Sequence, residues 1–352
     1  MSARREGREN RVRQAAVIGA GSWGSTFASM LAERCDTVLW AREPEVAEMI
    51  STSHQNPLFL PDFQLAESLR ASSSIDDVVE RRQLVVMAVP TQYMRSIAQR
   101  IAARVDPTAI VISLAKGIEQ GTLRRPSQIL TEVLVGNDPS LVGVLSGPNL
   151  AREVMAGQPS ATVVALPDDE AARQVQSLLM TDRFRVYTSG DVVGCEMGGA
   201  VKNVIAIAVG MAEGLGFGWN ARAALITRGL AELTRLGVAL GGEALTFLGL
   251  AGNGDLIATC SSPQSRNRRV GVELGRGRSL PDISADTTMV AEGVTSAPAV
   301  LELAAQVGIE MPIAAQVQAV LEGTSAPATV VGTLMRRGAT TELHDLPPDA
   351  RG

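Results

Sequence analysis

One apolar stretch, residues 195–210, carries three polar side chains: Glu196, Lys202 and Asn203. Its composition predicts a buried helix, and a lysine is rarely left in such a segment without a partner or a task. A buried ammonium can stabilise negative charge that develops on a carbonyl oxygen and can donate a proton to it. The alternative is a lysine that reaches the surface or pairs with a carboxylate. Gly199 lies one turn before Lys202, so we expect it to clear space beside the ammonium.

Two later segments offer partners for this chemistry. Asp255 stands between a glycine-rich turn and an apolar segment, so it is either a helix cap or a carboxylate that faces Lys202. Ser265, Arg266 and Asn267 open a predicted helix, where hydroxyl, guanidinium and amide groups suit a phosphate. A solvated basic surface explains the same three residues equally well.

The start of the chain has the pattern of a dinucleotide site. An apolar run, residues 15–19, leads into Gly19, Gly21 and Gly24 and then into a helical pattern. These glycines allow a tight turn, close approach of the backbone to a pyrophosphate, and close packing of helix on strand. Glycine turns are common, so the motif depends on this strand–turn–helix context.

The end of the second predicted strand, residues 37–42, bears on the choice of cofactor. An acidic residue there would pair with the ribose hydroxyls of NAD, but the chain has Ala41 and Arg42. An arginine suits the 2′-phosphate of NADP, so we expect NADP or NAD with NADPH preferred. A solvated arginine opposite Glu43 or Glu45 is the alternative.

Two further predicted strands end in polar residues. Lys116 follows the apolar run 109–115, and Asn149 follows the run 141–146. Ligands of open parallel sheets bind beyond the carboxyl ends of the strands, so both residues are candidate contacts. A lysine in water at a strand end is the simpler reading of Lys116.

The alternation of strands and helices ends near residue 190, after which the pattern is helical. We therefore expect an α/β protein with a Rossmann-type NAD(P)-binding domain at 15–190 and an all-helical substrate domain at 191–340. A disordered leader at 1–14 and a flexible tail at 341–352 flank them. The apolar run at 197–212 is interrupted by polar residues, and we expect a core helix instead of a membrane span.

Bulk properties exclude several classes of function. The net charge of −5 argues against a nucleic-acid binder. The three cysteines are widely spaced and only two histidines are present, so no metal site is expected. Reduced thiols in a cytoplasmic protein are the expectation.

Taken together, the motifs resemble the NAD(P)-dependent sn-glycerol-3-phosphate dehydrogenase family of the soluble bacterial type. They follow the family's order over about residues 15–335: Gly19-Ala-Gly-Ser-Trp-Gly24, Ser113-Leu-Ala-Lys-Gly-Ile-Glu119, Leu145-Ser-Gly-Pro-Asn-Leu-Ala151, Glu196-Met-Gly-Gly-Ala-Val-Lys-Asn203, Arg222-Ala-Ala-Leu-Ile-Thr-Arg228, Gly254-Asp-Leu-Ile-Ala-Thr259, Ser265-Arg-Asn-Arg-Arg269 and Glu292-Gly-Val-Thr295. Two residues depart from the family pattern beside the site, Ala115 and Asn253.

The resemblance implies reversible reduction of dihydroxyacetone phosphate to sn-glycerol 3-phosphate, which supplies glycerophospholipid synthesis, by a homodimer. It implies that Lys202 is the catalytic residue and transfers the proton at the C2 oxygen. The implied substrate contacts are Lys116, Gly147, Asn149, Lys202, Asp255, Ser265, Arg266 and Asn267. The cofactor contacts, the motif glycines included, are Gly19, Gly21, Ser22, Trp23, Gly24, Arg42, Lys116, Ala151, Arg266, Val290 and Glu292.

Three other readings stay open at this point. Another β-hydroxyacid dehydrogenase would share the glycine turn and the helical domain, although the phosphate-like segment 265–267 argues against a non-phosphorylated acid. A regulator that binds NADP without turnover, or an interaction protein that keeps only the fold, would not need Lys202 and Asp255 in one cleft.

Overall fold

A computed structural model describes residues 12–286 and 291–330. The predicted tail, 341–352, and most of the predicted leader lie outside these ranges. The leader was predicted to extend to residue 14, whereas Val12 is buried and Gln14 already opens the first strand. Val12 packs into the same core as the strand, so the folded domain includes residues that the polar composition had placed in the leader.

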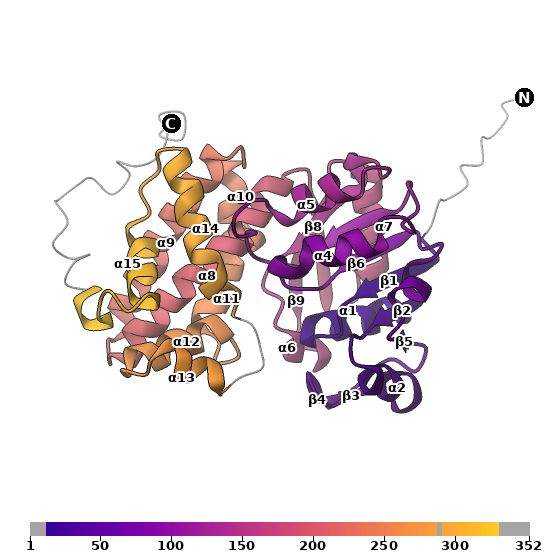
Figure 1. Cartoon of the computed structure of the whole chain (residues 1–352), viewed down its shortest axis with the longest axis horizontal. Helices are drawn as coiled ribbons and strands as arrows, with labels where there is room; N and C mark the ends of the chain where they lie inside the picture. Colours follow the sequence, from indigo (N-terminus) through magenta and orange to yellow (C-terminus); the bar gives the residue numbers. More distant parts are fainter. Residues whose placement is uncertain (1–11, 287–290, 331–352) are drawn as a thin grey trace, which may run out of the picture.

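An eight-stranded sheet forms the N-terminal half (Figure 1). Its strands, in spatial order, are β10 (Phe184–Ser189), β9 (Ser160–Ala165), β8 (Val142–Ser146), β7 (Ile110–Ser113), β6 (Leu84–Met87), β1 (Gln14–Ile18), β2 (Asp36–Trp40) and β5 (Arg70–Ser72). Neighbouring strands are parallel except β8 and β9, which are antiparallel. The strand order reverses at β1, which lies between β2 and β6, and a crevice for a ligand is expected beyond their carboxyl ends.

Both faces of this sheet are covered. Along β1, Ala15 and Val17 join one core, whereas Ala16 and Ile18 join another, as the period of two in a strand requires. The first core is shared with α1 (Ser22–Ala32) and α7 (Asp169–Leu179), and the second with α3 (Ile75–Val79), α4 (Thr91–Ile101) and α5 (Pro126–Val133). The predicted Rossmann-type arrangement is therefore confirmed.

A small hairpin follows α2 (Pro44–Ser53). Strands β3 (Gln55–Asn56) and β4 (Leu60–Gln64) pair there. The buried amide of Asn56 donates to the Ala20 carbonyl at 2.7 Å and to Ser25 Oγ at 2.8 Å. These long-range bonds hold the hairpin over the glycine turn, and local sequence patterns do not reveal them.

The C-terminal half is helical and surrounds α8 (Val192–Gly214), as Figure 1 shows. Its other helices are α9 (Trp219–Ala239), α10 (Ala244–Leu248), α11 (Asp255–Ser261), α12 (Arg266–Gly275), α13 (Leu280–Ala285), α14 (Glu292–Gln306) and α15 (Pro312–Leu321). Helix α8 is long and apolar enough to cross a membrane, but 89% of its apolar window is buried inside the protein. It is the core helix that the sequence predicts.

Glu196 of α8 connects this helix to the start of α5 in the N-terminal half. Its carboxylate is fully buried and accepts hydrogen bonds from Ser127 N at 2.6 Å and Ser127 Oγ at 2.7 Å, at the start of α5. Arg125 pairs with the same carboxylate. Burial raises the pKa of Glu196, and the Arg125 charge and the Ser127 hydrogen bonds oppose that rise.

Gly24→Ala should destabilise the fold, because a Cβ at residue 24 would lie 2.0 Å from the Gly19 carbonyl oxygen. We expect a loss of about 2 kcal/mol or more in the free energy of unfolding, measured by urea denaturation. Gly21→Ala is the matched control, since nothing lies within 4 Å of a Cβ there, and it should change stability by less than about 0.5 kcal/mol. Equal losses in the two variants would contradict this account of α1 packing.

Candidate active site

Two lysines meet on one buried carboxylate between the two halves of the molecule. Lys202 Nζ lies 2.5 Å from Asp255 Oδ1, and Lys116 Nζ lies 2.7 Å from Asp255 Oδ2. The three side chains are 6%, 14% and 3% exposed for Lys202, Lys116 and Asp255. Of the 32 lysines and arginines in the chain, these two are the only lysines. Asp255 is the first residue of α11, but Gly254 is the N-cap residue and no side chain caps the helix. The predicted carboxylate that faces Lys202 is therefore present, and the alternative of a helix cap is wrong.

Thr259 completes the surroundings of Lys202. Lys202 Nζ donates to Thr259 Oγ1 at 2.7 Å, and Thr259 lies one helical turn after Asp255. Thr259 is not among the predicted site residues. The four-residue spacing from Asp255 was the available signal, because it places both side chains on one face of a helix. Asn253, a departure from the family pattern, lies in the π-helical turn (Leu250–Gly254) that leads into Asp255.

Burial lowers the pKa of Lys202 from 10.5 to about 8. The charge of Asp255 opposes this shift, and the charge of Lys116 adds to it. The Lys202 ammonium can therefore release its proton near neutral pH, which an ordinary lysine cannot.

Gly199 makes room for Lys116 and not, as predicted, for Lys202. A Cβ at residue 199 would lie 3.1 Å from Lys116 Cγ and 3.3 Å from Ser146 Oγ. Helical spacing placed Gly199 near Lys202 along α8. It could not reveal that the side chain of Lys116, from the loop after β7, lies against the helix at this point.

A closed ring of hydrogen bonds holds the backbone of Lys116. Its carbonyl accepts from Asn203 Nδ2 at 2.9 Å, and its N–H donates to Glu292 Oε2 at 3.2 Å. Asn267 closes the ring, because its amide donates to Asn203 Oδ1 at 2.9 Å and accepts from Gly293 N at 2.9 Å. Both ends of the Asn267 side chain are thus engaged inside the protein.

The carboxyl end of β8 adds polar groups to the same place. The Gly147 carbonyl accepts from Lys116 Nζ at 2.9 Å, and the positive φ of 144° at residue 147 is one that glycine tolerates. Asn149 donates to Thr162 Oγ1 at 2.9 Å. Asn149 Oδ1 and Ser146 Oγ are buried without a hydrogen-bond partner in the described part of the chain, so both are free to bind a ligand.

The predicted dinucleotide contacts gather at the glycine turn. Gly19 has φ of 118°, and the space around Gly21 at the start of α1 is open. Ser22 Oγ donates to the Phe59 carbonyl at 2.7 Å, and Trp23 Nε1 is buried without a partner among the described residues. An open helix N-terminus and an orphaned indole N–H fit a bound dinucleotide.

The remaining predicted contacts lie at element ends. Ala151 opens α6 (Ala151–Met155), which packs against α1. The side chain of Arg42 is 80% exposed after β2. Glu292 begins α14, where its Oε1 accepts from Thr91 N and Thr91 Oγ1, both at 3.1 Å. Val290 lies outside the described residues.

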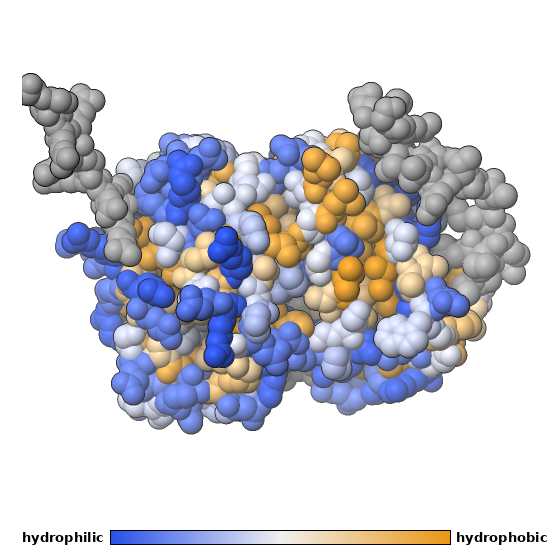
Figure 2. All heavy atoms as spheres, turned by 180° about the vertical axis from the view of Figure 1, so that it is seen from behind, coloured by the Kyte–Doolittle hydropathy of each residue, from blue (hydrophilic) through white to orange (hydrophobic). Residues whose placement is uncertain are grey.

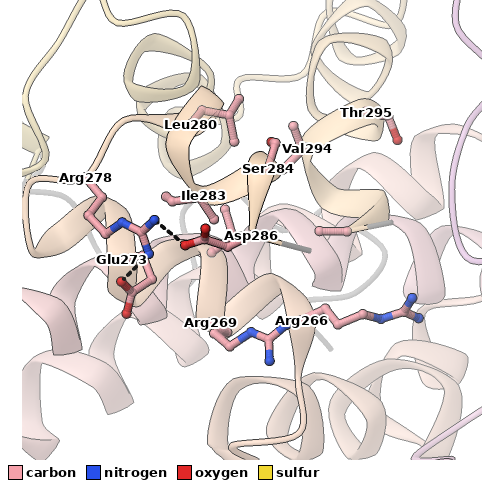
Figure 3. Close-up of a pocket in the computed structure, with 12 residues that line it drawn as sticks. Arg266, Arg269, Glu273, Arg278, Leu280, Ile283, Ser284, Asp286, Val294 and Thr295 are labelled. Atoms are coloured by element: carbon pink, nitrogen blue, oxygen red, sulfur yellow. Dashed lines mark hydrogen bonds and ion pairs between the residues drawn. The ribbon is translucent and has the colours of Figure 1, made fainter. Parts of the chain in front are cut away.

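The predicted phosphate segment begins α12. Ser265 Oγ accepts from Arg268 N at 3.2 Å, so this serine caps the helix. Arg266 is exposed and lines a cavity of about 500 Å³ between α12, α13 and α14. In Figure 3 its guanidinium points away from the ion pairs of Arg278 with Glu273 and Asp286. Neither lysine lines this cavity, so it is not where the ammonium groups lie.

Within residues 12–286 and 291–330, no group of three or more His, Cys, Asp or Glu side chains is placed to hold a metal ion.

Asp255→Asn should be strongly destabilising, because it leaves two buried ammonium groups without their carboxylate. We expect a loss of about 3–5 kcal/mol in the free energy of unfolding at pH 7, measured with urea. Glu170→Gln removes a carboxylate from an exposed pair with Arg173 and should cost less than about 1 kcal/mol. Similar losses in the two variants would show that Asp255 does not neutralise the site.

Both halves of the chain match known proteins. Residues 14–172 match the family model described as NAD-dependent glycerol-3-phosphate dehydrogenase N-terminus, and residues 191–332 match the corresponding C-terminus model. A glycerol-3-phosphate dehydrogenase [NAD(P)+] 2 of Sphingopyxis alaskensis is 48% identical over 93% of this chain and 98% of its own. A glycerol-3-phosphate dehydrogenase [NAD(P)+] of Frankia casuarinae is 49% identical over 93% of this chain and 97% of its own.

A solved structure extends the likeness to the fold. The crystal structure of glycerol-3-phosphate dehydrogenase from Coxiella burnetii has a TM-score of 0.87 and 35% identity, and the match covers 93% of this chain and 99% of that one. Two family models therefore cover both halves of the molecule, and relatives match it over nearly their whole length. The chain belongs to the NAD-dependent glycerol-3-phosphate dehydrogenase family.

Proposed function

We propose that this protein reduces dihydroxyacetone phosphate to sn-glycerol 3-phosphate, reversibly and with NAD(P)H, and so supplies glycerophospholipid synthesis. The observation that carries the proposal is the pair of ammonium groups on Asp255, between the carboxyl ends of β7 and β8 and the core helix of the other half. A ketone that gains a hydride needs positive charge and a proton at its oxygen, and this site offers both.

Lys202 is the proton donor in this proposal. The nicotinamide, when bound, supplies the hydride to C2. Lys202 Nζ stabilises the charge on the C2 oxygen and transfers its proton there, which contributes a factor of about 10²–10⁴. Lys116 adds a second positive charge. Asp255 holds both lysines, and Thr259 positions the ammonium of Lys202.

The start of α12 is the proposed site of the substrate phosphate. Arg266 is exposed at the first position of the helix, where the helix dipole and free backbone N–H groups favour an anion. Asn267 and the capping residue Ser265 lie on either side of it, and Gly147 and Asn149 contribute from β8. Binding energy from a remote phosphate can position the reacting carbon.

The dinucleotide is proposed to lie across the glycine turn. Gly19, Gly21 and Gly24 shape the turn, while Ser22, Trp23, Ala151, Lys116, Val290 and Glu292 provide contacts around it. Arg42 is proposed to bind the 2′-phosphate, so we expect NADPH to be preferred to NADH.

We further propose a homodimer in the cytoplasm, on the basis of the family resemblance. Large exposed apolar side chains of the helical half support an interface, among them Leu245 at 77% and Leu248 at 63%. Figure 2 shows apolar residues gathered on the helical part of one face. Light scattering coupled to size exclusion would give the mass in solution.

The direct test is loss of NADPH absorbance on addition of dihydroxyacetone phosphate, with NADH run in parallel. Unphosphorylated dihydroxyacetone is the control, because turnover of both ketones at similar kcat/KM would contradict a phosphate site at Arg266. If neither ketone oxidises NADPH although NADPH still binds, the assignment of the fold stands and the proposed reaction is refuted.

Lys202→Ala should abolish turnover, with a fall of at least about 10²-fold in kcat, because the proton donor is lost. NADPH binding, measured by nucleotide fluorescence, should persist. Thermal unfolding of the same sample separates lost chemistry from lost structure. A folded variant that keeps its turnover would remove Lys202 from the mechanism.

The rate of ketone reduction should fall as pH rises through about 8, because the donor must be protonated and the pKa of Lys202 is lowered to about 8. The reverse oxidation needs the neutral amine and should rise over the same range. The measurement is kcat/KM in both directions from pH 6 to 10. A rate of reduction that stays constant beyond pH 9 would contradict this assignment of the proton donor.

Arg42→Ala should raise the Kd of NADPH about tenfold or more and change that of NADH by less, because a charged hydrogen bond to the 2′-phosphate is lost. Calorimetric titration of both cofactors gives the ratio. Equal weakening of the two would refute the assignment of the 2′-phosphate.

A further inference from the structure

The residue next to Arg42 is placed to act on the same part of the cofactor. In the β1–β2 pair, Ile18 lies opposite Trp40, and the Gly19 N–H donates to the Trp40 carbonyl at 3.1 Å. The chain that leaves β2 therefore runs beside the glycine turn. In this fold the adenosine ribose lies at the end of that second strand.

Glu43 holds the guanidinium of Arg42. Arg42 Nε and Nη2 lie 2.9 Å and 2.6 Å from Glu43 Oε1, so one carboxylate oxygen takes both donors. The other oxygen, Oε2, takes no hydrogen bond from a described residue. The side chain of Arg42 is 80% exposed and that of Glu43 is 30% exposed. The pair is neutral as a whole and offers both a donor edge and an acceptor oxygen to a ligand.

The backbone presets the position of this carboxylate. Glu43 is the N-cap residue of α2 with φ of −85° and ψ of 118°, and Pro44 follows it. A residue before proline is restricted to extended conformations, so the Glu43 side chain leaves the chain in one general direction. Glu43 thus follows the last residue of β2, Trp40, by three positions, near the strand end at which NAD-binding proteins of this fold carry an acid.

We propose that Glu43 sets the division between NADH and NADPH: its carboxylate accepts hydrogen bonds from the ribose hydroxyls of NADH, and it repels and competes with the 2′-phosphate of NADPH for Arg42. This proposal rests on the binding of the 2′-phosphate by Arg42 proposed above. Hydroxyls can donate to a carboxylate, whereas a phosphate dianion cannot and is repelled by it. The Glu43 carboxylate thus preserves affinity for NADH although Arg42 favours NADPH.

The test is Glu43→Gln, which keeps the size of the side chain and removes its charge. We expect tighter NADPH, weaker NADH, and a rise of about three- to tenfold in the ratio of kcat/KM for NADPH to that for NADH, because exposed charges interact modestly. Glu45→Gln is the matched control. Glu45 is exposed in the first turn of the same helix and makes no ion pair with Arg42, so the ratio should change less than twofold.

Two outcomes overturn the proposal. A ratio within twofold of the unaltered protein shows that Glu43 does not discriminate, and weaker NADPH binding shows that Glu43 only orients Arg42. The double variant with Arg42→Ala should show less than half of the gain in NADPH affinity, since competition for the guanidinium is gone. Failure of the Arg42 assignment would appear separately, as equal loss of both cofactors in Arg42→Ala alone.

Discussion

The carboxylate of Asp255 between two buried ammonium groups is the interaction on which the site depends. Two like charges at hydrogen-bond distance from one anion leave a net positive charge in a nearly dry place. Such a charge is unfavourable in the resting protein. Burial and the neighbouring charge of Lys116 disfavour the charged form of Lys202, and its pKa is therefore lowered. The same excess of positive charge lowers the energy of an oxyanion that forms beside it. A neutral arrangement would avoid this cost, but it would not favour such an oxyanion.

Placing this charge requires elements from both halves of the chain. Lys116 comes from the loop that follows β7, whereas Lys202 and Asp255 come from helices of the other half. The ring through Asn203, Asn267 and the start of α14 holds the Lys116 backbone at both its N–H and its carbonyl. The two halves are therefore joined by directional hydrogen bonds at the site itself, and a shift of either half would move one ammonium away from the other.

The sequence predicted those features of the fold that depend on neighbouring residues along the chain. The strand, turn and helix around Gly19, the core helix with Lys202, and the helix that starts at Asp255 follow from hydrophobic periodicity and glycine turns, and the structure places them accordingly. Contacts between distant segments were not predictable in the same way. The neighbour of Gly199 was misassigned because it belongs to another half of the molecule. Likewise, the hairpin after α2 exists because Asn56 reaches the glycine turn, and no local signal marks that bond.

The sequence has no lysine other than Lys116 and Lys202, and this has a practical consequence. The surface cations of this protein are arginines, and its only two lysines share one carboxylate. Reagents that acylate side-chain amines therefore have no peripheral lysine to consume them. Any uptake at side chains therefore reports on the Lys116–Asp255–Lys202 cluster, and protection by a bound ligand can be read from total incorporation without mapping peptides. By the same property, a solid support that couples to lysine finds no exposed side-chain amine on this protein, because both lysines are buried on Asp255.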